Sequence, residues 1–411
     1  MKATEFSLKK GRTIMKNKNF IFIFFALLIL GSQGLPIPSQ QYKELENNID
    51  SLLKPGDIVG FSACIVKNNE VVWSMVRGKA DIENNIPVTP DTIFTLASLS
   101  KTVTGAALMQ LFDKGSFALD DDINKYLPFK IRNPKFPDVP ITFRMLLTHT
   151  SSLLDVRPYI KTLYGPGDQK AVSFGEIIKN CYKAKGKFYN ADNFMKNKPG
   201  DGWMYCNSNY VLIAYLVELI SKTPFPEYTK KYLFKPLEMN ETGWFYADFD
   251  KARLAVQYEG DTPDIAKKQR VDPYGWPGYP DGCLKTTPYQ YANFIKMLCN
   301  HGKYKGKQIL KPETVSMILT PQNVKIPRFK IIPPTLDMGL TWIVTKDDSQ
   351  QYFTHGGEGS GITTLAFFNP TTKTGAIMFL TGDYLKETGE FEKNPKRYTS
   401  LLFGLFAKYL N

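Results

Sequence analysis

Hydrophobic and polar positions follow strand-like patterns near both ends of the chain and helical patterns between them. Short apolar runs bounded by turn residues, which predict β-strands, occur at residues 58–67, 71–79, 340–345, 362–369 and 374–381. Helical patterns occur at residues 42–53, 141–148, 209–221, 226–234, 288–299 and 398–410. The pattern therefore predicts an α/β (α+β) protein in which both ends of the chain build one sheet and a mainly helical segment is inserted between them.

The length of the chain, 411 residues, exceeds what one simple core usually fills, so we expect two packed domains after a leader. The leader is residues 1–34, and a sheet domain is formed by residues 35–115 together with 281–411. An inserted, mainly helical domain is expected at residues 116–280. Within it, residues 155–200 are rich in Gly, Lys and Asn and show no readable pattern. We predict that they form a loop or cap at the rim of a pocket.

Residues 15–34 have the features of a secretory signal peptide. Two lysines precede an apolar run at residues 20–30, and small residues follow it. The run is shorter than the roughly 20 residues that a membrane span needs, so no stable membrane span is expected. An uncleaved anchor is the alternative. The sequence thus predicts a secreted, extracellular protein, or a periplasmic or lumenal one.

Charge and cysteine content exclude several classes of partner. The formal net charge is +13, of which the leader supplies +5, and the remaining lysines are scattered without interleaved aromatic residues. Nucleic acid is therefore not an expected partner. The five cysteines are too few, and odd in number, for a disulfide framework. No cysteine or histidine cluster has the spacing of metal ligands, so we expect neither a metal nor a cofactor.

The first candidate for chemistry is the pair Ser98 and Lys101 at the start of a long apolar helix. Residues three apart lie on one face of a helix, and a hydroxyl needs a neighbouring base to act as a nucleophile. Unpaired N–H groups at a helix start also stabilise a developing oxyanion. The same spacing occurs at Ser7 and Ser51, but Ser7 lies in the leader and Ser51 at a helix end, where the dipole has the wrong sign. The structural alternative is that Ser98 merely caps its helix.

The second candidate is Tyr205 with Asn207, which flank Cys206 between a loop and an apolar helix. A tyrosine beside a lysine ammonium gives up its proton more readily and then serves as a general base, and an asparagine amide binds a substrate carbonyl. The spacing recurs at Tyr291 and Tyr409, so it is not unique. A packed aromatic residue is the alternative role for Tyr205.

The third candidate is His355-Gly356-Gly357 on a strand-like run. Glycines allow a substrate backbone to approach a strand closely, and the next N–H, that of Glu358, would complete an oxyanion hole. An ordinary turn is the alternative. The tripeptide at residues 373–375, Lys-Thr-Gly, lies between two strand-like runs and is interpreted as a hairpin tip.

In this order, the three motifs resemble those of the serine β-lactamase and penicillin-binding protein superfamily. The nearest resemblance is to the class C β-lactamase-like branch, which includes family VIII esterases and D-aminopeptidases. It covers roughly residues 45–410 and extends to further short matches at residues 119–121, 126–128, 141–142, 146–151, 199–200 and 236–239. The resemblance implies a β-lactamase/transpeptidase-like fold, with an antiparallel sheet flanked by N- and C-terminal helices.

The resemblance also implies roles for these residues. Ser98 would be the acylated nucleophile, Lys101 its proton acceptor, and Tyr205 the base that serves the leaving group and the deacylating water. Asn207 would orient the substrate and Lys101. His355 stands where lactamases carry a lysine, and the N–H groups of Ser98 and Glu358 would form the oxyanion hole.

These residues predict a secreted serine hydrolase that forms an acyl-enzyme at Ser98 and cleaves a small-molecule ester, amide or peptide. Histidine in the third motif favours such substrates over β-lactams, and Glu358 is expected to disfavour substrates with a free carboxylate. The chain has no Gly-x-Ser-x-Gly elbow, so His149 is expected to brace its loop rather than join a Ser-His-Asp triad. Two alternatives stay open: a D-Ala-D-Ala carboxypeptidase or β-lactamase, and a non-catalytic ligand-binding protein of the same fold.

Overall fold

The computed structural model describes residues 40–53, 58–260, 264–326, 337–347, 350–382 and 398–410. The predicted signal peptide, the rest of the leader and the Ser7 motif lie outside the described residues, so secretion stays a prediction. Within the described ranges, no helix combines the length and apolar character needed to cross a membrane.

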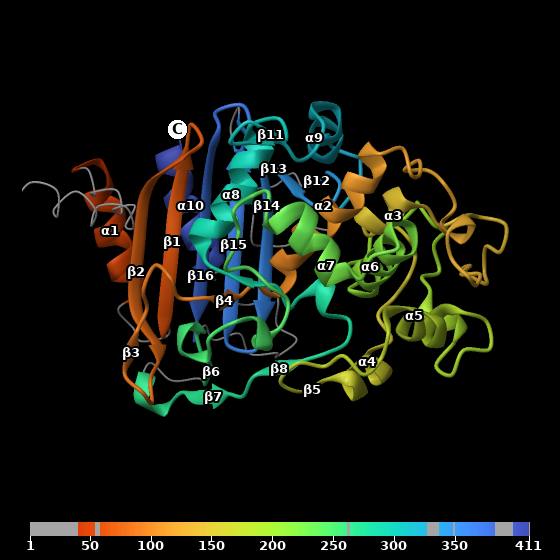
Figure 1. The fold of residues 1–411 in the computed structure, drawn as a ribbon, viewed down its shortest axis with the longest axis horizontal. Coiled ribbons are helices and arrows are strands. Elements are labelled where there is room, and N and C mark those ends of the chain that lie inside the picture. The colour runs from red at the N-terminus through yellow and green to blue at the C-terminus, as the bar shows by residue number, and fades with distance from the viewer. Residues whose placement is uncertain are drawn as a thin grey trace, which may run out of the picture. The chain divides into compact units, whose positions relative to one another are not determined.

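An antiparallel sheet of eight strands is built from both ends of the chain, as predicted (Figure 1). Its order is β12 (Asp337–Met338), β13 (Ile343–Asp347), β14 (Gln350–Gly359), β15 (Ile362–Asn369), β16 (Thr374–Thr381), β1 (Gly60–Lys67), β2 (Glu70–Asp81) and β3 (Ile86–Pro87). Strand β1 pairs with β16, with Gly60 opposite Thr381. The first and last strand-forming segments thus meet in the middle of the sheet.

Period-two alternation on the central strands supplies a core on each face of the sheet. On one face, Phe61, Phe367 and Met378 pack against the two terminal helices. On the other face, neighbouring residues such as Phe368 and Phe379 join a larger core that includes the helices of the middle of the chain. Strands β15 and β16 are buried along their whole length, and accordingly neither contains a charged residue.

The helices carry the rest of the fold. They are α1 (Gln40–Leu53), α2 (Ser100–Asp113), α3 (Phe143–Leu147), α4 (Arg157–Leu163), α5 (Phe174–Tyr182), α6 (Ser208–Ser221), α7 (Phe225–Thr229), α8 (Pro288–Cys299), α9 (Pro312–Leu319) and α10 (Tyr398–Leu410). Helix α2 is buried on all sides from Ser100 to Leu111, and it packs against α6, α9 and the turn at Tyr279–Asp281. The boundaries predicted for two domains, near residues 115 and 280, stay predictions.

The structure corrects the interpretation of residues 155–200 as a patternless loop or cap. This segment contains α4 and α5. The apolar residues of α5 stand at helical spacing and are buried, and the Ser173 side chain caps the helix by accepting a hydrogen bond from Glu176 N–H. The strand predicted at 340–345 is also shifted, to β13.

Hairpins join consecutive strands of the large sheet, and four short strand pairs lie outside it. Asn68 and Asn69 both have positive φ, which suits the tight turn between β1 and β2, and Lys373 has positive φ at the tip between β15 and β16. The short pairs are β4 (Phe94–Thr95) with β9 (Lys285–Thr286), β5 (Gly165–Pro166) with β8 (Tyr274–Gly275), β6 (Gln257–Glu259) with β7 (Gln269–Val271), and β10 (Lys303–Tyr304) with β11 (Lys307–Gln308). All five cysteines are free thiols.

Candidate active site

Ser98 lies in a single 3-10 turn that leads directly into α2. Just before this turn, β4 pairs with β9, and Leu96 O accepts a hydrogen bond from Thr364 Oγ1 of β15 at 2.7 Å. Ala97 has a φ of +46°, a left-handed conformation that is unfavourable for alanine. The paired strands and the sheet therefore hold a strained turn that presents the Ser98 side chain.

Lys101 lies in the first turn of α2 and its side chain is fully buried. Its Nζ donates a hydrogen bond to Ser98 Oγ at 3.2 Å and a second to the main-chain oxygen of Asp281 at 2.7 Å. Nζ also lies 5.1 Å from the centre of the Tyr205 ring. The predicted Ser98–Lys101 pair is thus in hydrogen-bond contact. The Asp281 carbonyl also orients Lys101. The role of Asn207 in orienting Lys101 stays a prediction.

Opposing effects act on the charge of Lys101. Burial by itself lowers the pKa of Lys101, but attraction to Tyr205, Asp281 and Asp155 outweighs burial, and the net pKa is raised above its ordinary value. Asp281 is also buried, and it accepts a hydrogen bond from Trp276 Nε1 at 3.1 Å. Burial raises the pKa of Asp281 to about 7, although the charge of Lys101 opposes this. Lys101 is therefore an ammonium at neutral pH in the resting site, and it can accept a proton only after passing one on.

We expect Asp281→Asn to stabilise the protein more at about pH 8 than at about pH 4. Asp281 has a folded-state pKa of about 7 against an ordinary value of 3.8, so the wild type loses stability as the pH rises through this window. Asparagine keeps an oxygen for the Trp276 N–H but has no charge to bury. The free energy of unfolding of the variant minus that of the wild type should therefore increase by about 4 kcal/mol between these two pH values.

Urea unfolding at the two pH values measures this difference. Burial lowers the pKa of His355 to about 4, which removes stability as the pH falls, but this contribution is common to both proteins and cancels in the subtraction. A difference in unfolding free energy that is the same at both pH values would show that Asp281 does not titrate in this range.

His149 binds the segment that carries Tyr205. Its Nδ1 accepts a hydrogen bond from Cys206 N–H at 3.1 Å, and its main-chain oxygen accepts one from Met204 N–H at 2.9 Å. The His149 ring stacks on the Tyr205 ring with centroids 4.4 Å apart. Burial holds the pKa of His149 well below its ordinary value, so the ring is neutral at pH 7. His149 thus braces this loop, as the sequence predicted.

Asp155 binds the residues that follow Tyr205. Its Oδ2 accepts a hydrogen bond from Asn207 N–H at 3.0 Å, and its Oδ1 accepts bonds from the N–H and the hydroxyl of Ser208, each at 2.9 Å. These contacts satisfy N–H groups at the start of α6. The Asn207 side chain is left to line the cavity described below. Asp155 was not predicted from the sequence, because it lies 52 residues before Asn207 in the segment rich in Gly, Lys and Asn.

Strand β14 carries the third predicted motif past the Ser98 turn. A Cβ atom placed on Gly357 would lie 2.2 Å from Leu96 O, so this close approach requires glycine. His355 is buried, and its Nδ1 lies 2.7 Å from the carbonyl oxygen of Gly356. Burial, together with the charge of Lys101, lowers the pKa of His355 to about 4. His355 is therefore neutral at pH 7 and adds no positive charge at the position where lactamases carry a lysine.

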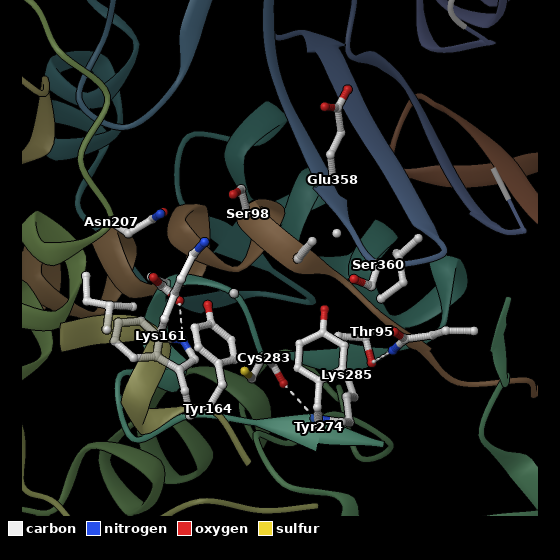
Figure 2. A pocket seen from close by; sticks show the side chains of 18 of the residues that line it. Thr95, Ser98, Lys161, Tyr164, Asn207, Tyr274, Cys283, Lys285, Glu358 and Ser360 are labelled. Carbon is white, nitrogen blue, oxygen red and sulfur yellow. Dashed lines mark hydrogen bonds between the residues drawn. The ribbon is translucent and has the colours of Figure 1, made fainter. Parts of the chain in front are cut away.

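A cavity of about 540 Å³ opens beside Ser98, and Asn207 and Glu358 also line it. Figure 2 shows Ser98 and Asn207 on one side of this space and Tyr164 on the other, while the Glu358 side chain extends away from Ser98. Tyr164 stacks on Trp276 with ring centroids 5.6 Å apart. The site therefore combines a hydroxyl in contact with a buried ammonium, an amide, and an aromatic wall, a combination that suits acyl transfer from a small substrate.

Comparisons with known proteins agree with this geometry. The sequence profile of the Beta-lactamase family matches residues 45–394. Protein flp of Staphylococcus aureus (strain MW2) is 23% identical over 376 residues, covering 89% of this chain and 69% of that protein. The putative penicillin-binding protein PbpX of Bacillus subtilis (strain 168) is 33% identical over 217 residues, covering 52% of this chain and 48% of that protein.

Solved structures share the fold. The octameric penicillin-binding protein homologue from Pyrococcus abyssi has a TM-score of 0.70 at 25% identity, covering 89% of this chain and 77% of that chain. D-amino acid amidase from Ochrobactrum anthropi SV3 has a TM-score of 0.69 at 21% identity, covering 90% of this chain and 100% of that chain. EstCE1, a hydrolase with promiscuous acyltransferase activity, has a TM-score of 0.68 at 18% identity, covering 89% of this chain and 98% of that chain. The predicted β-lactamase/transpeptidase-like fold is confirmed.

Proposed function

This chain belongs to the Beta-lactamase family and is a serine hydrolase, and from that premise we propose that it forms an acyl-enzyme at Ser98 and cleaves small esters, amides or peptides. The observation that carries the proposal is the Ser98–Lys101 contact. A buried ammonium 3.2 Å from a serine hydroxyl, with a tyrosine ring 5.1 Å away, supplies a nucleophile and a route for its proton.

The proposed proton path uses Lys101 and Tyr205 as a pair. In the reactive form that we propose, the pair holds one proton fewer than a lysine ammonium and a tyrosine hydroxyl together, so it can accept the proton of Ser98. Ser98 Oγ attacks the carbonyl carbon, its proton moves to Lys101, and Lys101 passes one to the Tyr205 oxygen. The bond from the carbonyl carbon to the leaving group then breaks, and Tyr205 protonates the departing oxygen or nitrogen. Water repeats these steps on the acyl-enzyme, which releases the acid and restores Ser98.

Two further groups are proposed to bind the reacting carbonyl. The N–H groups of Ser98 and Glu358 lie on segments in contact, since β14 packs against the Ser98 turn, and they would hold the oxyanion. The Asn207 amide lines the cavity and would bind a carbonyl on the acyl side of the substrate. The neutral state of His355 supports ester and amide substrates over those that need a cation at this position.

We expect a fluorophosphonate serine probe to label the wild type and to fail to label Ser98→Ala. The hydroxyl in contact with Lys101 is the one expected to be activated, whereas Ser360, which also lines the cavity, is hydrogen-bonded to Tyr274. Ser360→Ala is therefore the matched control and should be labelled like the wild type. Intact mass spectrometry reads the adduct, and labelling of Ser98→Ala at the wild-type level would overturn the proposal.

A second candidate function is a D-Ala-D-Ala carboxypeptidase or β-lactamase, which the 33% identity to the putative penicillin-binding protein PbpX favours. Rates measured on the same protein preparation with different substrates separate the candidates. Faster hydrolysis of a chromogenic cephalosporin than of a short-chain nitrophenyl ester would make the carboxypeptidase or β-lactamase function the first candidate. Tight reversible binding without turnover of esters, amides or lactams would instead favour a non-catalytic role.

A further inference from the structure

Two basic side chains, Arg157 and Lys161, line the cavity beside Ser98 from helix α4. They stand four residues apart and therefore on one face of the helix. Both are exposed, and neither makes an ion pair or side-chain hydrogen bond with any residue that the structure describes. Figure 2 shows the Lys161 side chain extending from α4 towards Ser98 and Asn207. The pair thus offers a molecule in the cavity two positive charges that have no direct ion-pair partner among the described residues.

The acidic side chains that line the same cavity are committed elsewhere. Both carboxylate oxygens of Asp155 accept hydrogen bonds from residues 206–208. Asp281 accepts a hydrogen bond from Trp276 and is largely protonated below its pKa of about 7. Glu358 extends away from Ser98 (Figure 2). The wall formed by α4 therefore keeps its positive character towards the reacting centre.

Helix α4 is fastened in place, so its basic residues are not on a loose loop. Directly after the helix, β5 pairs with β8, and Tyr164 stacks on Trp276. A Cβ atom on Gly275 of β8 would lie 2.6 Å from the carbonyl oxygen of Gly167, which shows how closely the two segments approach. Ile160 on the inner face of α4 is buried. The backbone beneath Lys161 is therefore positioned by packing, and its side chain reaches into the cavity from a defined direction.

We propose that Arg157 and Lys161 bind a carboxylate carried by the acyl part of the substrate. The acyl side is assigned because Lys161 extends towards Asn207, whose amide is proposed to bind the acyl side. This inference rests on the proposed function, since it names the substrate class of the acyl-enzyme at Ser98. It also replaces the expectation that Glu358 makes the site unfavourable for carboxylates.

Two 4-nitrophenyl esters test the proposal. One is the mono-ester of adipic acid, whose acyl group ends in a carboxylate, and the other is the corresponding ester of adipic acid monoamide, which has the same shape without the charge. We expect the wild type to prefer the charged ester in kcat/KM by about tenfold, as a charge-assisted contact in a partly enclosed site provides. Added salt should reduce this preference.

The preference, taken as the ratio of kcat/KM for the two esters, is then compared between variants. Lys161→Gln should lower the ratio about tenfold, Arg157→Gln should lower it less, and Lys161→Arg should retain most of it. Lys179→Gln removes the same charge from α5, outside the cavity, and should leave the ratio at the wild-type value.

A ratio unchanged in both Lys161→Gln and Arg157→Gln would overturn the proposal, as would an equal loss in Lys179→Gln, which would indicate a long-range effect of net charge. The uncharged ester separates this result from the proposed function. If its enzymatic hydrolysis persisted in Ser98→Ala, the acyl-enzyme proposal would fail whatever the ratio shows.

Discussion

Lys101→Ala is expected to lower kcat for a neutral nitrophenyl ester by about 10⁴-fold, the same loss as Ser98→Ala. The two side chains are expected to act as a unit, because the Lys101 ammonium donates a hydrogen bond to Ser98 Oγ and is proposed to carry its proton towards Tyr205. Once either partner is missing, removing the other should cost little more. The double variant Ser98→Ala/Lys101→Ala should therefore be about as active as each single variant.

Two controls make this prediction specific to chemistry. Lys101→Met fills most of the buried volume without a charge and should be as inactive as Lys101→Ala, so that a cavity in α2 is not the cause. Thermal unfolding of each variant shows that it is folded. A loss of only a few-fold in Lys101→Ala would mean that Tyr205 or His355 takes the proton directly from Ser98.

Gly357→Ala is expected to cost about 1–3 kcal/mol of unfolding free energy and at least about 100-fold in kcat/KM. Its Cβ would lie 2.2 Å from Leu96 O and 2.4 Å from Thr364 Oγ1. The Thr364 hydroxyl can rotate away, but the Leu96 carbonyl belongs to the backbone of the strained Ser98 turn. Strand β14 and this turn must therefore move apart, which displaces the N–H groups of Ser98 and Glu358 from each other.

Gly356→Ala is the matched control for folding, because its side chain would point to the other face of β14. The nearest atom to its Cβ is Thr364 O at 3.6 Å, an ordinary contact. Urea unfolding should therefore give a much smaller loss for Gly356→Ala than for Gly357→Ala. Equal stability of the two variants would show that the close approach of β14 to Leu96 is not maintained in solution.

Strong local signals account for the parts of the fold that were predicted from the sequence. Helix α8 and strands β15 and β16 begin and end at the predicted residues, because turn residues or a cap bound each apolar run. Helix α5 was missed although its buried residues have helical spacing, since abundant Gly, Lys and Asn around it obscured the pattern. Helix α4 has only seven residues, too few for periodicity to show.

The candidate site, too, was predicted from the sequence only in part. Ser98 and Lys101 are three residues apart on one helical turn, so their contact follows from helix geometry once the helix is recognised. Asp155 and the Asp281 carbonyl were not predicted. Asp155 meets residues 207 and 208 across a long loop, and a main-chain oxygen carries no side-chain signal.

The sequence by itself determined the main strands, most of the longer helices, the pairing of both chain ends into one sheet, and the types of group available for acyl transfer, because these depend on local periodicity and on residue chemistry. Only the tertiary structure decided which of those groups meet, and in what charge state. Attraction to Tyr205 and Asp281 keeps Lys101 an ammonium although it is buried, and burial makes His355 neutral. The position of α4 brings Arg157 and Lys161 to the wall of the cavity beside Ser98. These outcomes depend on distances and desolvation between segments far apart in the chain, which no local pattern encodes.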